Sequence, residues 1–328
     1  MRAVLFLATW CLVGAAFSQQ LPQYTQAALN RTLYNPAFIG DEQKMEASAG
    51  GRWQMIGFGN EPRTAFLTFE KGINVKKKPV YNPAFRISRE IPNENNFQKR
   101  KFSHGWGTQL IADNFGAFRS FQLAGLYGAH YEINRDLKVS GGLRLSFNNN
   151  GFDAGKAFVL NPSTPTEEYA GGDAEYDAYT DGRPNTNFIH LGAGFNVQYQ
   201  KFFIGASVNQ LTKDAIRFGA TGVNFDPTMH FFVMTGYTFE FNSEFSLRTI
   251  ATVKKMLPAP TSFELAAIAN IGESLWAGIN YHHQSSVGFI VGFNVTNNFK
   301  VGYALDVPTT SLNKFSFGGH ELVLNYRF

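Results

Sequence analysis

The stretch "SVGFIVGFNV" at residues 286–295 alternates with a period of two, and this alternation decides the fold class. In an extended chain, successive side chains point to opposite faces. One face is apolar and consists of Val287, Phe289, Val291, Phe293 and Val295. The opposite face carries Gly288, Gly292 and Asn294. An apolar face backed by small and polar residues is typical of a strand in a membrane-spanning β-barrel.

The same alternation recurs through most of the chain. In "FIHLGAGFNVQY", residues 188–199, apolar side chains at odd positions oppose His190, Asn196 and Gln198. In the last segment, Leu322, Leu324, Tyr326 and Phe328 oppose Glu321, Asn325 and Arg327. Fourteen such segments begin near Glu46, Thr64, His104, Arg119, Leu137, Phe188, Lys201, His230, Glu244, Pro260, Glu273, Ser286, Asn298 and Gly319. An even count is what a single-chain bacterial barrel requires, so the sequence predicts an all-β, antiparallel transmembrane barrel of about 14 strands.

The links between these segments alternate in length. From the fourth segment on, every second link is very short, at residues 134–136, 200, 242–243, 272 and 297–298. The alternate links include the long stretches 148–187, 211–228 and 307–318. Since outer-membrane barrels have short periplasmic turns and long external loops, we expect both termini in the periplasm. One periplasmic link, about 73–103, is long, and a loop of this length is usually functional.

Residues 1–18 are predicted to be a secretory signal peptide. Arg2 precedes an apolar run that ends at Phe17, and small residues allow cleavage before Gln19. The run is shorter than the roughly 20 residues that a membrane-spanning helix needs. We therefore divide the chain into the signal peptide, a periplasmic N-terminal segment at 19–45 and an outer-membrane barrel at 46–328.

Composition excludes several other classes of protein. The net charge is only +4, and no stripe of Lys and Arg with interleaved aromatic residues indicates nucleic-acid binding. The lone cysteine, Cys11, lies in the predicted signal peptide, so the mature chain has none. His282 and His283 are neighbours on a predicted strand and point to opposite faces, so they cannot share one metal ion. No dinucleotide fingerprint or nucleophile motif is present, and neither enzymatic activity nor a cofactor is expected.

The motif "YNPAF" occurs at Tyr34–Phe38 and again at Tyr81–Phe85. The flanking residues differ, so the motif does not indicate a structural repeat. Asn-Pro favours a turn, and both copies are predicted on the periplasmic side. We expect one docking surface for periplasmic partners there, made by Asn35, Pro36, Phe38, Lys76, Lys77, Lys78, Asn82, Pro83 and Phe85. The alternative is two independent turns that pack their own aromatic side chains.

Two predicted links carry opposite charge. Residues 71–101 contain nine basic and two acidic side chains, and they could either dock an acidic partner or be a solvated loop. Residues 151–182 are acidic and lack the spacing of an EF-hand, which favours solvation or contact with an exported protein.

Three stretches resemble the PorP/SprF family of outer-membrane proteins. They are "QQLPQYTQAALNRTLYNPAFIG" at 19–40, "GRWQMIGFGNEPRTAFLTFE" at 51–70 and "VGYALDVPTTSLNKFSFGGHELVLNYRF" at 301–328. The terminal pattern is the most specific, and it is matched by Tyr303, Asp306, Gly318, Gly319, His320, Glu321 and Phe328, with Gly319 where the family usually has Ser. The resemblance implies a component of the type IX secretion and gliding machinery, which exports proteins carrying a C-terminal sorting domain. Its implied partners are outer-membrane lipid, secretion and gliding proteins of the periplasm and outer membrane, and exported cargo.

We therefore expect a non-enzymatic barrel that anchors periplasmic machinery, an exported cargo protein, or both. One alternative is a diffusion channel or fatty-acid-type transporter, since a barrel of this size can enclose a lumen. The predicted inward residues Phe203, Ile250, Ile268 and Trp276 favour an occluded lumen instead. A second alternative, a secreted β-protein, would need hydrophilic outer faces. The terminal aromatic residues Tyr326 and Phe328 are predicted to be a barrel assembly signal.

Overall fold

The structure is a computed structural model, and it describes residues 24–27, 29–42, 44–57, 61–74, 102–153, 156, 185–212, 217–218, 228–256 and 259–328. Most of the two charged links lies outside these residues. The undescribed residues of the basic link include Lys76, Lys77, Lys78, Asn82, Pro83 and Phe85. Residues 1–23 are also outside the described ranges.

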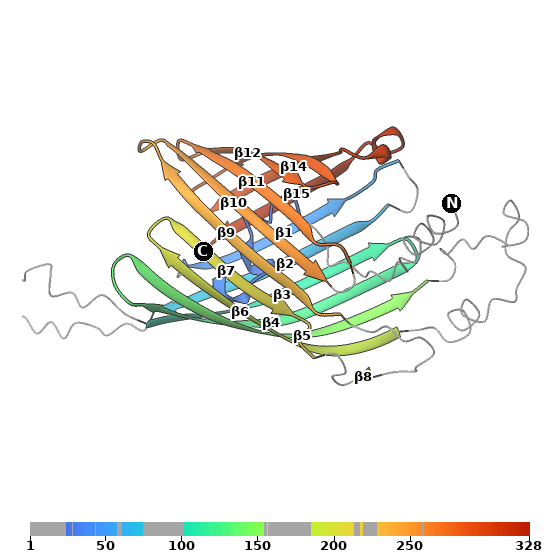
Figure 1. Ribbon diagram of the computed structural model, residues 1–328, viewed down its shortest axis with the longest axis horizontal. Coiled ribbons are helices and arrows are strands. Elements are labelled where there is room, and N and C mark those ends of the chain that lie inside the picture. Colours follow the sequence, from blue (N-terminus) through green and yellow to red (C-terminus); the bar gives the residue numbers. More distant parts are fainter. Residues whose placement is uncertain are drawn as a thin grey trace, which may run out of the picture.

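Fourteen antiparallel strands form a closed barrel (Figure 1). They are β1 Met45–Trp53, β2 Arg63–Asn74, β3 Phe102–Phe115, β4 Phe118–Glu132, β5 Leu137–Phe152, β6 Asn185–Tyr199, β7 Phe202–Asn209, β9 His230–Glu240, β10 Phe245–Met256, β11 Ser262–Ile271, β12 Leu275–His282, β13 Ser286–Asn294, β14 Phe299–Pro308 and β15 Gly319–Arg327. A further two-residue strand, β8 Arg217–Phe218, pairs with β6. The ring closes because β15 pairs with β1 and β5 pairs with β6. The predicted fold class is confirmed.

Each wall strand begins within three residues of its predicted start. The predicted faces are also confirmed, since Phe195 and Phe289 are about half exposed on the outer face. Phe203, Ile250, Ile268 and Trp276 are buried inside the barrel, as the alternation indicated. The strand register could be predicted because a shift of one residue would exchange the two faces.

The two ends of the barrel differ in their links. At one end, here called the turn end, short links at 133–136, 200–201, 241–244, 272–274 and 295–298 join the strands. The chain also enters β1 and leaves β15 at this end. The opposite end, here called the loop end, carries the links that follow β1, β5, β7 and β14.

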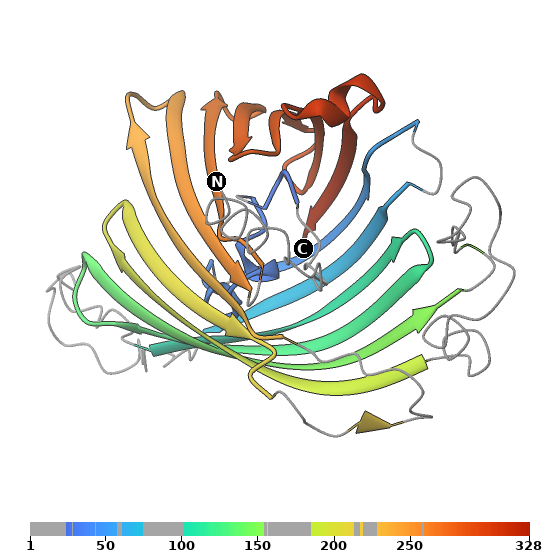
Figure 2. The same cartoon turned by 45° about the vertical axis from the view of Figure 1, so that its right-hand side comes forward.

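The wall is uneven in height. Strands β3 to β6 contain 14 to 16 residues, whereas β12 to β15 contain 8 to 10 (Figure 2). The short 3-10 helices η1 Arg31–Leu33 and η2 Pro36–Phe38 precede β1, and η6 Ser311–Lys314 lies between β14 and β15. Within the described ranges, no helix combines the length and the apolar character needed to cross a membrane.

Candidate functional site

The described residues between 24 and 41 occupy the interior of the barrel, and we call them the plug. Residues 24–27 and 32–40 are all buried, and Figure 2 shows this segment in blue in the middle of the ring of strands. The predicted periplasmic position of segment 19–45 is therefore corrected for this part. Asn35, Pro36 and Phe38 were expected on a rim, but they are buried among wall residues and offer no exposed surface in this conformation.

The first "YNPAF" motif forms the η2 turn at the centre of the plug. The side-chain oxygen of Asn35 accepts a hydrogen bond from the Ala37 nitrogen at 2.9 Å, and Pro36 occupies the first helical position. The side-chain nitrogen of Asn35 donates to the carbonyl oxygen of Phe195 on β6 at 3.2 Å. The motif therefore builds its own turn and also attaches that turn to the wall.

Glycines on the inner face make room for this turn. A Cβ atom on Gly142 of β5 would lie 2.3 Å from the carbonyl carbon of Pro36. A Cβ atom on Gly194 of β6 would lie 2.0 Å from Oδ1 of Asn35. Both distances are far below van der Waals contact, so only glycine allows the plug to approach these strands so closely.

Side chains from several sides of the barrel bind carbonyl oxygens of the plug. The pairs are Gln109 Nε2 to Thr32 at 2.8 Å, Arg144 Nη1 to Leu33 at 3.1 Å, Ser207 Oγ to Tyr34 at 2.8 Å, Asn280 Nδ2 to Thr25 at 2.9 Å and His130 Nε2 to Ile39 at 2.9 Å. These donors lie on β3, β5, β7, β12 and β4. These hydrogen bonds give the plug carbonyls the partners that a regular helix or sheet would otherwise supply.

The strands β14 and β15 bind the beginning of the plug through carboxylates. Glu321 accepts two hydrogen bonds, from the backbone nitrogens of Thr25 at 2.7 Å and Gln26 at 3.0 Å. The Thr25 hydroxyl donates to Asp306, and Arg52 Nη2 lies 2.8 Å from the same carboxylate oxygen. Asp306 and Glu321 belong to the terminal sequence pattern, so that pattern encodes a binding site for the plug.

A buried ion pair contacts the middle of the plug. Lys254 Nζ lies 2.6 Å from Glu264 Oε2 and donates to the hydroxyl of Tyr34 at 3.2 Å. The ammonium group also lies 4.5 Å from the centroid of the Tyr34 ring. This geometry combines a salt bridge with a cation–π contact.

Aromatic side chains pack the plug against the apolar part of the inner wall. Ring centroids lie 5.1 Å apart for Tyr24 and Phe66, 5.0 Å for Tyr34 and Phe232, and 5.6 Å for Phe38 and Phe203. Inward apolar residues of the wall are therefore partners of the plug. They do not line an open pore.

The plug extends from the loop end toward the turn end. Thr25 contacts Glu321 near the beginning of β15, which starts at the loop end. Asp41 forms an ion pair with Lys138 at the beginning of β5, at the turn end. The lumen is thus occupied along much of its length.

A family model described as "Type IX secretion system membrane protein PorP/SprF" matches residues 16–326. The chain belongs to the PorP/SprF family. The match includes the plug, thirteen strands of the wall in full and β15 up to Tyr326. It confirms the resemblance that the terminal pattern indicated.

Solved structures similar to this PorP/SprF protein are outer-membrane barrels. The CymD monoaromatic hydrocarbon channel has a TM-score of 0.50 at 12% identity, with 96% of this chain and 95% of that chain covered. The toluene transporter TodX of P. putida has a TM-score of 0.48 at 9% identity, with 91% and 94% covered. A FadL homologue of Pseudomonas aeruginosa has a TM-score of 0.47 at 10% identity, with 94% and 95% covered. These low identities show a shared fold alone, and no curated protein matches the chain.

The predicted assembly residues of this PorP/SprF protein lie at the closing seam. The side chains of Tyr326 and Phe328 are exposed on the outer face, with ring centroids 4.9 Å apart. The Phe328 nitrogen donates to the Met45 carbonyl oxygen at 3.0 Å, which joins the end of the barrel to its first strand. Their role in assembly stays a prediction.

Sequence reasoning missed the plug and its wall partners. The signal was the presence of Arg144, Glu264, Asp306 and Glu321 on predicted inward faces, because buried charges need partners. Among the residues that the structure describes, no group of three His, Cys, Asp or Glu side chains is placed to hold a metal ion.

Proposed function

We propose that this protein is a non-conducting and non-enzymatic outer-membrane component of type IX secretion or gliding motility. In this role it anchors periplasmic machinery, an exported cargo protein, or both. The observation that supports the proposal is the plug, which occupies the lumen and is hydrogen-bonded to wall strands on several sides. A barrel closed in this way is suited to present surfaces at its two ends.

The alternative function is a diffusion channel or a fatty-acid-type transporter. Passage through the lumen would require the plug to leave its site and to break its hydrogen bonds to Glu321 and Arg144. A hydrogen bond to a charged group contributes roughly 1.5–3 kcal/mol, so several of them make spontaneous opening rare.

Conductance separates these two functions. Purified wild-type protein in planar lipid bilayers should show no steady large conductance, whereas a variant lacking residues 24–41 should show stable openings. Wild-type openings as large as those of the deletion variant would favour the transporter. A silent deletion variant that is correctly inserted would show that something other than the plug closes the lumen.

We further propose that the turn end, where the chain leaves β15, faces the periplasm. Of the two predicted periplasmic termini, this proposal keeps the C-terminus only, because the plug begins near Thr25 at the loop end. The link between β2 and β3 leaves the barrel at this end and carries Lys76, Lys77 and Lys78, followed by Asn82, Pro83 and Phe85. Its eight basic residues against two acidic ones favour an acidic periplasmic partner. The buried Asn35, Pro36 and Phe38 have no part in this proposed surface.

Charge reversal tests the docking surface. Replacing Lys76, Lys77 and Lys78 with Glu should reduce the recovery of periplasmic proteins in pull-downs from detergent-extracted membranes, more strongly at low salt than at high salt. The control reverses Glu167 and Glu168 to Lys in the acidic link and should leave this recovery unchanged. Equal recovery by the lysine variant and wild type at both salt concentrations would contradict the docking proposal without affecting the conductance result.

A further inference from the structure

The plug begins at the loop end of the barrel. The hydroxyl of Thr25 donates to Asp306 of β14, and its carbonyl oxygen accepts from Asn280 of β12 at 2.9 Å. Its amide nitrogen donates to Glu321 of β15 at 2.7 Å. Each of these three wall residues is the third residue from the loop end of its strand. Three strands therefore hold Thr25 close to the rim at this end.

The plug finishes at the turn end. The carbonyl oxygen of Ile39 lies 2.9 Å from Nε2 of His130, which is the third residue from the turn end of β4. Asp41 forms an ion pair with Lys138, the second residue of β5. From Thr25 to Asp41 the chain thus crosses the barrel once, in the direction from the loop end to the turn end.

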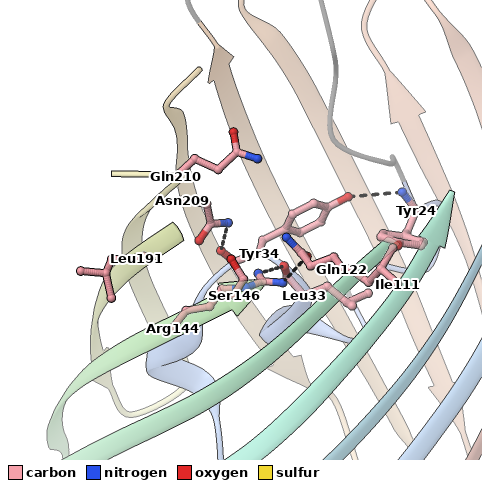
Figure 3. A pocket seen from close by; sticks show the side chains of 11 residues that line it. Tyr24, Leu33, Tyr34, Ile111, Gln122, Arg144, Ser146, Leu191, Asn209 and Gln210 are labelled. Atoms are coloured by element: carbon pink, nitrogen blue, oxygen red, sulfur yellow. Dashed lines mark hydrogen bonds between the residues drawn. The ribbon is translucent and has the colours of Figure 1, made fainter. Parts of the chain in front are cut away.

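Within the described part of the molecule, the space beside the plug is too small for a second passage of the chain. Figure 3 shows a cavity between Tyr24 and Tyr34 of the plug and Arg144 of the wall, and its volume of about 20 Å³ holds about one water molecule. At β5 the plug lies directly on the wall, since a Cβ atom on Gly142 would lie 2.3 Å from Pro36. A return to the turn end would have to run beside the plug, so the chain that precedes Tyr24 leaves the barrel at the loop end.

The predicted mature chain is long enough to reach past the rim. It begins at Gln19, so residues 19–23 precede Tyr24. Five extended residues span about 17 Å. A strand rises about 3.3 Å per residue, so the rim lies roughly 7 Å beyond the wall residues that bind Thr25. The segment can cover this distance and extend beyond the barrel.

We propose that the plug displays the amino-terminal end of the mature chain beyond the loop end, on the opposite side of the membrane from the C-terminus. An even number of antiparallel strands begins and ends on one side, so the plug is the element that separates the two termini. Which side is external rests on the proposed function, in which the turn end faces the periplasm. Residues 19–23 are then an interaction segment at the cell surface, which an exported protein can contact while periplasmic partners meet the turn end.

Cysteine labelling of intact cells tests this topology. The predicted mature chain has no cysteine, so Gln20→Cys places a single thiol in the displayed segment. Asn313→Cys is the matched control in an exposed link at the loop end, and Asn297→Cys is the control in an exposed turn at the turn end. The reagent is a maleimide attached to a polyethylene glycol too large for outer-membrane pores. The Gln20 and Asn313 variants should be labelled to the same extent in intact cells, and the Asn297 variant only after the outer membrane is permeabilised.

The comparison with the two controls separates the topology from the orientation of the barrel. If the Gln20 and Asn313 variants label together but only after permeabilisation, while the Asn297 variant labels in intact cells, the display stands and the proposed orientation is wrong. If the Gln20 variant labels with the Asn297 variant, or under neither condition, the display proposal is wrong whatever the orientation. Mass spectrometry of the purified variant checks that residue 20 is retained, and its removal with the signal peptide would overturn the proposal as well.

Discussion

Glu321 binds the backbone of Thr25, with 2.7 Å between the carboxylate oxygen and the amide nitrogen, although the two residues are 296 positions apart in the chain. The other oxygen of the same carboxylate accepts from the next amide, that of Gln26. Since Glu321 supplies the acceptors for both amides, substitution of this one side chain tests the attachment.

Glu321→Gln should loosen the plug while leaving the barrel inserted. The amide group keeps one acceptor oxygen but directs an NH2 group toward a backbone N–H, so one hydrogen bond is lost and the other is no longer charge-assisted. We expect maleimide labelling of a Thr32→Cys thiol to become about tenfold faster. The control is Glu244→Gln in an exposed turn, which should label at the wild-type rate. Unchanged labelling in the Glu321 variant would mean that the carboxylate does not hold the plug.

Gly142→Val should expel the η2 turn from its seat on β5. The first added carbon alone would lie 2.3 Å from Pro36, and because β5 is paired on both sides, the turn has to move away. We expect fast labelling of the plug, with normal heat-modifiable gel mobility of the barrel. The matched control is Gly141→Val at the adjacent position, where an added Cβ meets nothing within 4 Å. Equal behaviour of the two variants would show that the plug does not depend on this close approach.

The Lys254–Glu264 pair should show strong coupling in a double-mutant cycle. Lys254→Met or Glu264→Gln alone leaves one buried group without its partner, and breaking a buried pair costs about 3–5 kcal/mol. The double variant should lose less stability than the sum of the two single losses. The midpoint temperature of the heat-modifiable transition measures this. Strict additivity would mean that the two side chains do not stabilise each other.

Phe328→Asp should lower the amount of inserted barrel in the outer membrane. The side chain lies on the outer face, where an aromatic residue favours the membrane interface and a carboxylate opposes it. Phe315→Asp, at an equally exposed aromatic residue in the link before β15, is the control and should insert normally. Normal insertion of both variants would show that the terminal aromatic residue is no assembly signal.

The wall of the barrel could be predicted from the sequence because each strand has two faces in different surroundings, an apolar outer face and an inner face of mixed polarity. A period of two fixes both the extent of a strand and the orientation of its side chains, so even the buried Ile268 and Trp276 were assigned to the correct face. The positions of the short turns could be predicted from the breaks between these alternating segments.

The plug could not be predicted in this way. Its segment "YTQAALNRTLYNPAF" has no period, because it contacts the wall on many sides, and several of its carbonyl oxygens accept from side chains of distant strands. Asn35 and Pro36 correctly indicated a turn. Nothing local to that turn shows whether its surroundings are water or the inside of a barrel, and this is why the rim position of the first "YNPAF" motif was wrong.

The position of Glu321 on β15 also has a consequence for biogenesis. Glu321 pairs in register with Arg52 of β1, across the seam where the last strand meets the first. In a barrel with an empty lumen, Glu321 would lose the amides of Thr25 and Gln26 and would face Arg52 and the open lumen instead. The same carboxylate thus lies at the closing seam and holds the plug, so seating of the N-terminal segment adds hydrogen bonds to the strand that completes the ring.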